Sequence, residues 1–373
     1  MEQKRLGDIA TYINGYAFKP EDRGSTGLPI IRIQDLTGNA YDLGFYDGKY
    51  PEKIEINDGD VLISWSASLG VYIWNRGRGL LNQHIFKVVF DKCEVNKQYF
   101  VFAVKYKLKE MELKTHGATM KHIVKKDFDN TVIPFPTVEK QADIAYILSK
   151  IESIVEFRQQ ELQQLDDLIK ARFVEMFGEP RINPNKYPTK MIKDTCIVIT
   201  GNTPSRKVDE YYGDAIEWIK TDNIVSGLLY PTVASESLSD SGKAVGRTVD
   251  AGAILMACIA GSVASIGRVC ITDREVAFNQ QINAIVPKEY DVRFLHALLQ
   301  ISKDYLVEDI NMALKGIMSK SKLEEKEFIV PSMEEQVGFA EFVEQVDKSK
   351  VAVQKALDET QLLFDSLMQE YFG

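Results

Sequence analysis

The strongest constraint on the fold of this chain is that part of its sequence occurs twice. Residues 133–141 read IPFPTVEKQ and residues 329–336 read IVPSMEEQ, so that a proline and a glutamine recur after 195 residues. From there the two copies align without a gap until both end in Phe-Gly, at 177–178 and 372–373. A sequence that repeats itself in this way predicts a structural unit that is built twice.

Upstream of this segment the two copies still correspond, but their spacing drifts. It grows from 188 residues between Ile31 and Ile219 to 199 residues between Gly117 and Gly316. A gapless part behind a gapped part indicates that the two tails have one common task and that the two heads have different ones. The sequence therefore predicts four segments, which are head one (1–137), a central helical tail (138–178), head two (179–331) and a distal helical tail (332–373).

In both tails, apolar residues recur at alternating spacings of three and four, which is the pattern of an amphipathic helix. Pro136 and Pro331 end the strand before each tail, and Gly178 can end the first helix. About 35 helical residues form a rod of about 50 Å, and its apolar stripe must be covered. We expect the two tails to pack on each other; the alternative is that each packs on its own head. The predicted packing residues are Ile144, Ile147, Ile151, Ile154, Leu162, Leu165, Phe339, Phe342, Val346, Val353, Leu357 and Phe364.

Both heads alternate short apolar runs with turn signals. In head one the runs lie at 28–33, 59–64 and 84–90. A helical stretch follows near residues 99–113, and head two has a counterpart at 292–307. This pattern predicts a mixed α/β domain with more strand than helix.

The composition is that of a globular, cytosolic protein. Hydrophobic residues make up 45% and charged residues 27% of the chain. The longest apolar run, 253–260, predicts a buried strand because it is too short to cross a bilayer. The N-terminus shows no apolar region of the kind that directs secretion. The four cysteines lie far apart without a C-x-x-C spacing, which argues against a zinc site or a disulfide framework.

The net charge of −9 disfavours contact with DNA, but this charge is unevenly distributed. The tails carry −3 and −6, whereas head one carries +2 and head two −2. Nearly neutral heads can still bind phosphate through local clusters of bases, although weakly. We therefore expect a partner to supply much of the positive charge.

Three segments resemble the specificity subunit of type I restriction–modification systems. Residues 133–148, with the pattern I-P-F-P-x-x-E-x-Q followed by I-A-x-I-L, are similar to the central conserved helical region of that family, and residues 331–336 are similar to the distal one. The run TGNTPSR at 200–206 and the Tyr-Tyr pair that follows it are similar to the opening of the family's target recognition domains. Head one departs from this opening, because residues 14–19 read NGYAFK.

The resemblance covers essentially the whole chain and implies a fold, a function and partners. The implied fold is α/β, with two similar mixed α/β target recognition domains joined by two long antiparallel helices in a pseudo-two-fold repeat. Each domain would read one half of a bipartite target in double-stranded DNA. The helices would set the spacing and dock methyltransferase subunits and, through them, restriction subunits. The chain would act in the prokaryotic cytoplasm as a non-catalytic subunit, without a membrane partner.

Motifs that accompany catalysis are missing from the sequence itself. There is no G-x-x-x-x-G-K phosphate loop, and no glycine-rich loop for S-adenosylmethionine follows a strand. Residues 183–186, NPNK, lack the second proline and the aromatic residue with which adenine methyltransferases hold a flipped base. We therefore expect no cofactor on this chain, and we expect S-adenosylmethionine and ATP on its partner subunits.

Several loops that carry basic and hydroxyl groups are candidates for DNA contact. The 203–207 loop of head two offers two hydroxyls and two long cations, and arginine can bridge guanine O6 and N7; the alternative is a turn that caps the next element. The RGRG hairpin at 76–79 and the basic clusters after Gly117 and Gly316 are further candidates, with solvated loops as the alternative. The candidate DNA-binding residues are Lys19, Arg76, Arg78, Lys121, Lys125, Lys126, Thr203, Ser205, Arg206, Lys207, Ser319, Lys320 and Lys322.

An Asn-Gln pair occurs in both heads, at 82–83 and at 279–280. Amides are the usual partners of adenine. Because the pair recurs in heads that should read different sequences, a structural role in satisfying backbone groups is favoured.

Two other classes of function are compatible with these residues. One is a coiled-coil scaffold whose α/β heads bind protein or small ligands. The other is a self-sufficient methyltransferase or nuclease.

Overall fold

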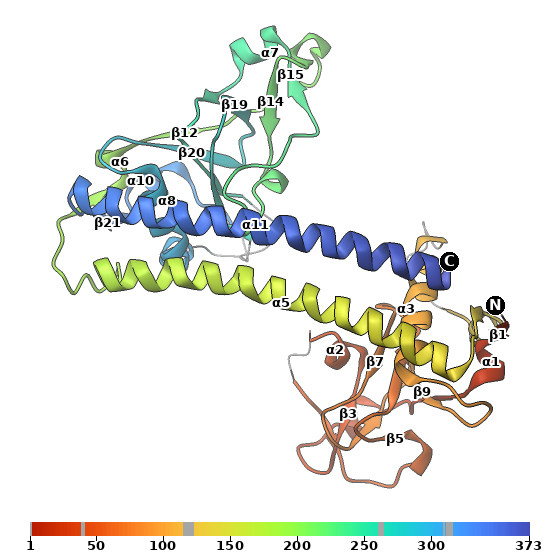
Figure 1. Cartoon of the computed structure of the whole chain (residues 1–373). Coiled ribbons are helices and arrows are strands. Elements are labelled where there is room, and N and C mark those ends of the chain that lie inside the picture. The colour runs from red at the N-terminus through yellow and green to blue at the C-terminus, as the bar shows by residue number, and fades with distance from the viewer. Residues whose placement is uncertain (1, 39–41, 115–122, 260–264, 309, 311–315) are drawn as a thin grey trace. The chain divides into compact units, whose positions relative to one another are not determined.

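The computed structural model describes residues 2–38, 42–114, 123–259, 265–308, 310 and 316–373. The chain forms two compact units: Met1–Arg158 with Ala356–Gly373, and Gln159–Lys355. Each unit combines one head with half of each of two long helices (Figure 1).

Head one contains two four-stranded sheets that are built from short strands, and β1 (Gln3–Arg5) pairs with β10 (Val132–Pro134) in a further two-stranded sheet. The order of the first sheet is β2 (Thr11–Asn14), β9 (Ile85–Val89), β6 (Val61–Ser64) and β7 (Gly70–Ile73). The order of the second is β4 (Phe45–Tyr46), β3 (Leu28–Ile31), β8 (Gly79–Leu81) and β5 (Glu55–Ile56). All of these pairs are antiparallel except β3 with β8, which is parallel.

Head two repeats this strand order and adds one edge strand, β13 (Tyr212–Gly213), to its second sheet. The order of its first sheet is β12 (Cys196–Thr200), β20 (Ile282–Pro287), β17 (Ile254–Ala257) and β18 (Val269–Ile271). The order of its second is β13 (Tyr212–Gly213), β15 (Ser237–Leu238), β14 (Ile216–Ile219), β19 (Val276–Phe278) and β16 (Thr248–Val249). Again one pair, β14 with β19, is parallel. The two heads are therefore copies of one mixed α/β design, as the sequence repeat predicts.

Shorter elements complete the two heads. In head one they are β1 (Gln3–Arg5), α1 (Leu6–Ile9), η1 (Pro20–Asp22), α2 (Ile33–Leu36), η2 (Glu52–Ile54), α3 (Lys97–Lys114), α4 (Lys125–Asp129) and β10 (Val132–Pro134). In head two they are β11 (Thr189–Met191), α6 (Ile192–Thr195), η3 (Asp209–Tyr211), η4 (Thr221–Asn223), α7 (Asp240–Val245), α8 (Val292–Ile301), α9 (Lys303–Val307), α10 (Lys320–Glu324) and β21 (Glu327–Ile329).

The central strand of each first sheet is buried on both faces. On β6, Val61 and Ile63 belong to the core shared with the helices, whereas Leu62 between them belongs to the core between the two sheets. Successive side chains of a strand point to opposite faces, so one apolar run serves two cores. On β17, Met256 belongs to the core shared with the helices, and Leu255 belongs to the core between the two sheets. This is why the 253–260 run predicted a buried strand correctly.

Each predicted tail is a single helix of 40 residues, α5 (Val138–Phe177) and α11 (Met333–Phe372). In the first unit the beginning of α5 shares a core with the end of α11, through Ile144, Leu148, Ile151, Phe364, Met368 and Phe372. In the second unit the end of α5 shares a core with the beginning of α11, through Ile169, Phe173, Phe177, Phe339, Val343 and Val346. The two helices are therefore antiparallel, as expected. None of the helices in the described part of the chain combines the length and apolarity that a membrane span needs.

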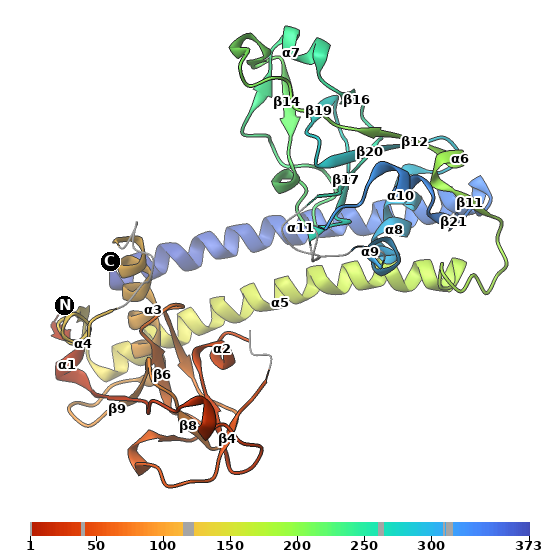
Figure 2. The same ribbon diagram turned by 180° about the vertical axis from the view of Figure 1, so that it is seen from behind.

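The stripe of each helix is covered both by the other helix and by a head. Phe102 of α3 packs on Phe364 with 6.1 Å between ring centroids, and Phe294 of α8 packs on Phe173 with 5.5 Å. Figure 2 shows α8 and α9 of head two beside the second half of α5. The two packing alternatives that the sequence left open thus occur together.

Two of the predicted packing residues are wrong. Ile147 and Ile154 are 40% and 43% exposed, and the buried neighbours are Leu148 and Val155. One residue along a helix is a rotation of about 100°, so a stripe assigned one position early points away from the core. Of the remaining predicted residues, Ile144, Ile151, Phe339, Val346, Leu357 and Phe364 are buried, and Leu162, Leu165, Phe342 and Val353 are half-buried.

The repeated glutamine explains why the repeat is so strict at this point. Gln141 is fully buried; its Oε1 accepts from the Asn96 backbone N–H at 2.9 Å, and its Nε2 donates to the Pro136 carbonyl at 2.8 Å. Gln336 makes the same two bonds, with the Asp291 N–H at 2.9 Å and the Pro331 carbonyl at 3.0 Å. In both units the glutamine therefore joins the start of the head's helix to the start of the long helix.

Candidate DNA-recognition sites

In both heads the two parallel strands end side by side and present loops at the same place. The pairs Ile31 with Leu81 and Ile219 with Phe278 are the last of each parallel ladder. The opening loop of each head crosses this end, because Tyr16 N–H donates to the Leu81 carbonyl at 2.8 Å. In head two the Asn202 N–H donates to the Phe278 carbonyl at 3.2 Å. We call these places the strand-end sites, formed by residues 15–19, 32–35 and 82–83 in head one and by residues 201–207, 220–223 and 279–280 in head two.

A glycine lets the opening loop approach the other strand closely in each site. A Cβ on Gly15 would lie 2.0 Å from the Asn82 carbonyl oxygen, and a Cβ on Gly201 would lie 2.2 Å from that of Asn279. These contacts are with backbone atoms, which cannot move aside as a flexible side chain could. The glycine shared by NGYAFK and TGNTPSR is therefore a steric requirement of the site.

Gly201→Ala should therefore destabilise the protein by about 2 kcal/mol, because the added methyl group overpacks a backbone crossing. Gly338→Ala is the matched control: it lies on the exposed face of α11 with no atom near its Cβ, and the same change should stabilise by about 0.5–1 kcal/mol. Urea unfolding of both variants and the parent measures this. A Gly201→Ala protein as stable as the parent would show that the loop accepts a side chain.

The asparagines of the two Asn-Gln pairs hold the backbone, which agrees with the structural role that their recurrence predicts. Asn82 Oδ1 accepts from the Gln83 N–H at 2.9 Å, and Asn279 Oδ1 accepts from the Gln281 N–H at 3.0 Å. The glutamines differ from them, because the side chains of Gln83 and Gln280 are exposed at the strand-end sites. The sequence does not distinguish the two residues of each pair. In the structure the asparagine side chain bonds to the backbone, whereas the glutamine side chain is exposed.

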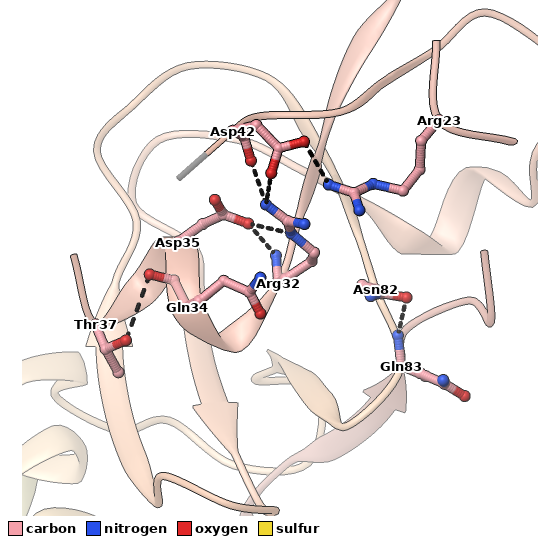
Figure 3. A network of polar contacts seen from close by, with 8 residues as sticks. All are labelled: Arg23, Arg32, Gln34, Asp35, Thr37, Asp42, Asn82 and Gln83. Carbon is pink, nitrogen blue, oxygen red and sulfur yellow. Dashed lines mark hydrogen bonds and ion pairs between the residues drawn. The ribbon is translucent and has the colours of Figure 1, made fainter. Parts of the chain in front are cut away.

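In head one, Arg23 and Arg32 both lie against the carboxylate of Asp42 (Figure 3). Arg32, at the end of β3, is buried between Asp35 and Asp42, with 3.1 Å from its Nε to Asp35 Oδ2 and 3.7 Å from its Nη2 to Asp42 Oδ1. Arg23 lies on the other oxygen of Asp42, at 3.3 Å. With two carboxylates for two guanidinium groups, this cluster is electrically balanced.

Head two repeats the cluster with one carboxylate fewer. Lys220, which is 188 residues after Arg32, and Arg206 both bind Glu236, at 2.9 and 2.6 Å. Lys220 and then Arg206 hold the pKa of the Glu236 carboxyl below its usual value. Here the residue at the position of Asp35 is Asn223, whose Oδ1 accepts from the Lys220 N–H at 3.0 Å. The cluster therefore keeps a net positive charge beside an exposed loop.

Arg206 is also the residue of this loop that is held most firmly. Its guanidinium carbon lies 4.4 Å from the ring centroid of Tyr212 and 5.1 Å from that of Trp218. Thr203 donates from Oγ1 to the Gln280 side chain, which links the loop to the Asn-Gln turn. Ser205 and Lys207 are exposed on the same loop.

The remaining candidates lie apart from the strand-end sites, except Lys19, which belongs to the opening loop of head one. Arg76 and Arg78 precede β8 at its other end, where Arg76 stacks on Trp74 at 4.8 Å and Arg78 pairs with Glu55 at 2.8 Å. Lys125 and Lys126 are exposed on α4, and Ser319, Lys320 and Lys322 are exposed on or beside α10. Ser319 caps α10 by accepting from the Lys322 N–H at 3.3 Å. Lys121 lies outside the described residues.

Sequence reasoning missed Arg23, Arg32 and Asp42 of head one and Glu236 of head two as members of the two clusters. Each is an unremarkable charged residue in its own segment. The fold brings Arg23 and Arg32 to Asp42 in head one, and separately brings Glu236 to Arg206 and Lys220 in head two. The one available signal was the correspondence of Arg32 with Lys220 in the repeat.

Known proteins agree with this architecture. Residues 1–167 and 184–360 match the family described as type I restriction modification DNA specificity domain. The chain is 24% identical to the type I restriction enzyme EcoBI specificity subunit of Escherichia coli, over 98% of this chain and 84% of that one. It is 23% identical to the MjaVIII specificity subunit of Methanocaldococcus jannaschii, over 95% and 89%.

Two solved structures have the same fold. The type I restriction–modification S subunit of M. genitalium superposes with a TM-score of 0.56 at 13% identity, covering 100% of this chain and 96% of that chain. A chain from a structure that concerns complex assembly and conformational transition of the type I R-M system has a TM-score of 0.57 at 15% identity, covering 99% and 97%. This chain therefore belongs to the type I restriction–modification DNA specificity family, and the resemblance that its motifs indicate is confirmed.

Proposed function

We propose that each head of this specificity subunit reads one half of a bipartite target in double-stranded DNA. The observation that carries the proposal is that the two strand-end sites share one frame and differ in what they expose. Head one presents Lys19 and Gln83, whereas head two presents Thr203, Arg206 and Gln280. A common frame with different exposed donors suits two readers of different base sequences, because base choice depends on the hydrogen-bonding groups that reach the groove.

The same proposal assigns no catalysis to this chain. Methyl transfer would come from methyltransferase subunits that carry S-adenosylmethionine, and cleavage from restriction subunits that use ATP. The support is the lack of a phosphate loop, of a loop for S-adenosylmethionine and of an adenine-methylating motif in the sequence. The basic residues on α4 and α10 are proposed phosphate contacts, which position the duplex without reading it.

A stripe on α5 supports protein docking on the long helices. Tyr146 and Phe157 are 65% and 67% exposed, and Ile147 and Ile154 are exposed beside them. The four side chains fall within about 100° of the helix circumference, so they form one apolar face. Exposed aromatic residues grouped in this way are typical of protein interfaces. We assign this face to a methyltransferase subunit, and we assign to the helix pair the role of fixing the gap between the half-sites.

The experiment that tests the function is a map of methylated sites in DNA from cells that hold the cognate methyltransferase subunit with or without this chain. We expect two short motifs separated by a fixed unread gap, and no methylation at these sites without the chain. The purified chain alone should transfer no methyl group from labelled S-adenosylmethionine to DNA. A continuous motif, or methyl transfer by the chain alone, would contradict the proposal.

The double variant Tyr146→Ala/Phe157→Ala should weaken binding to the methyltransferase subunit at least about 30-fold, because truncation of central interface aromatics commonly costs 2 kcal/mol or more. Its unfolding should be unchanged, since neither side chain is buried. Val351→Ala, which removes another exposed side chain, on α11, is the control and should bind as the parent does. Isothermal titration calorimetry with the purified methyltransferase subunit measures the affinity of both variants and of the parent. Equal affinities of all three proteins would remove this face from the interface.

A further inference from the structure

We propose that Glu236 is a positioning residue that holds the Arg206 guanidinium ready for a guanine, and that it thereby fixes one base preference in the second half-site. The inference rests on the proposed function and names a residue that does not itself touch DNA.

The first step is that Arg206 is preorganised. Its Nη2 donates to Glu236 Oε2 at 2.6 Å, and the faces of Tyr212 and Trp218 lie against its guanidinium. A free arginine side chain samples many rotamers, and ordering it on binding costs entropy. Here three groups have already selected one orientation, although the side chain is still 53% exposed. The guanidinium thus meets the groove already oriented.

The second step is that the arrangement favours a base over a phosphate. The guanidinium has five N–H donors in a planar fork, and the Glu236 carboxylate accepts from one of the two N–H groups on Nη2. The other N–H on Nη2 can therefore act together with an N–H of Nη1 or of Nε along one edge of the fork. A pair of donors in a plane matches O6 and N7 of guanine. The Glu236 carboxylate offsets part of the positive charge that would attract an anionic phosphate to this place, whereas the neutral edge of a base does not depend on that charge. Lys207, exposed on the next residue, has the flexible point charge that suits a phosphate.

The third step is that Glu236 itself is fixed. Its other oxygen binds Lys220 at 2.9 Å, and the Lys220 ammonium lies 5.2 Å from the ring centroid of Trp218. A carboxylate held from two sides cannot swing away with the arginine, so it can set the direction of the guanidinium.

Head one lacks this support among its described residues, which confines the inference to the second half-site. Arg23 binds Asp42 at the longer distance of 3.3 Å, and Asp42 is an exposed residue. Arg32 is buried and already saturated by Asp35 and Asp42, so it cannot reach a groove. The base preferences in the first half-site should therefore not change in Glu236 variants, and they serve as an internal reference for the second half-site.

The experiment compares Glu236→Gln, Glu236→Asp and Arg206→Lys in the assembled complex with the methyltransferase subunit. Methylation rates are measured on duplexes that carry each single base change across both half-sites. The parent should prefer guanine at one position of the second half-site by about 10- to 100-fold. Glu236→Gln and Arg206→Lys should reduce that preference about tenfold and leave every other position unchanged, and Glu236→Asp should restore part of it.

Two controls separate this outcome from a loss of stability or of phosphate contact. Glu275→Gln removes another 2.6 Å ion pair of head two, with Lys243, and should leave all preferences unchanged. Lys207→Ala should lower the rates on all sequences together and make them less sensitive to salt. Glu236→Gln would overturn the inference if it acted as Lys207→Ala does, or if it left the guanine preference intact in a complex that reads a bipartite target. A parent complex without a bipartite target would instead overturn the proposed function.

Discussion

Adding two residues to both long helices is expected to abolish sequence-specific methylation, whereas adding four should preserve it and widen the unread gap in the target. The insertions are placed after Arg158 in α5 and after Lys355 in α11, where one compact unit gives way to the other. Two residues rotate the rest of a helix by about 200°, but four rotate it by about 400°, which nearly restores the original phase.

The physical reason is that the apolar stripe of each helix continues through both units. Ile144 and Phe173 of α5 are both buried, one in the core of each unit. A rotation of about 200° would turn one of these halves outward or break the helix. With four residues the stripe stays in place and the rod grows by about 6 Å, which corresponds to one or two base pairs at about 3.4 Å each.

Maps of methylated sites for the two insertion variants and the parent measure the outcome. With four residues added, both half-site sequences should be retained while the gap grows. An unchanged gap after the four-residue insertion, or full activity after the two-residue insertion, would show that the helices do not set the spacing.

Phe339→Ala should cost about 3–5 kcal/mol, which is a large share of the stability of a typical domain. Phe339 is fully buried at the beginning of α11, and its ring packs against Phe173, Phe177 and Phe294 with centroids 5.3, 5.7 and 6.1 Å away. These rings come from α5, α8 and α11, so one truncation loosens both long helices and head two. We expect early unfolding of the second unit and loss of the second half-site.

Leu362→Ala is the control for this truncation, because it removes a large side chain from the same helix where that side chain is 71% exposed. It should change the free energy of unfolding by less than about 0.5 kcal/mol. Urea unfolding followed by circular dichroism compares the two variants. If Phe339→Ala were as stable as Leu362→Ala, the aromatic cluster would not hold the helices together.

The repeat and the helical period were enough to predict the two heads, the long helices and their packing on each other, and the family resemblance implied that the helices are antiparallel. Periodicity fixes the phase of a helix to about one residue, and this is why Ile147 and Ile154 were assigned to a face that Leu148 and Val155 occupy. Such an error disappears only when the partner of the stripe is known. Here the partner is both the other helix and a head.

The candidate sites were predicted less well, because a sequence shows charges but not what neutralises them. Arg206 belonged to a motif and was a candidate, whereas Glu236 lies thirty residues away and comes to it only when β15 pairs with β14. Arg76 and Arg78 looked equally basic, yet they lie at the opposite end of β8 from the Asn-Gln turn. The order of the strands decides which cations lie close together. Strand pairs as short as β3 with β4, which comprise two residue pairs, are difficult to predict from the sequence.

The division of each long helix between two units has a consequence for biosynthesis. The second unit is one continuous stretch, Gln159–Lys355, and every residue of its core has been made once Lys355 leaves the ribosome. The first unit is discontinuous: head one is synthesised first, but its core takes in Phe364, Met368 and Phe372 from the last part of the chain. Domains generally fold in the order of synthesis. In this chain we expect the order to be reversed for the final step, because head one, which is synthesised first, completes its core only when the end of α11 has been made.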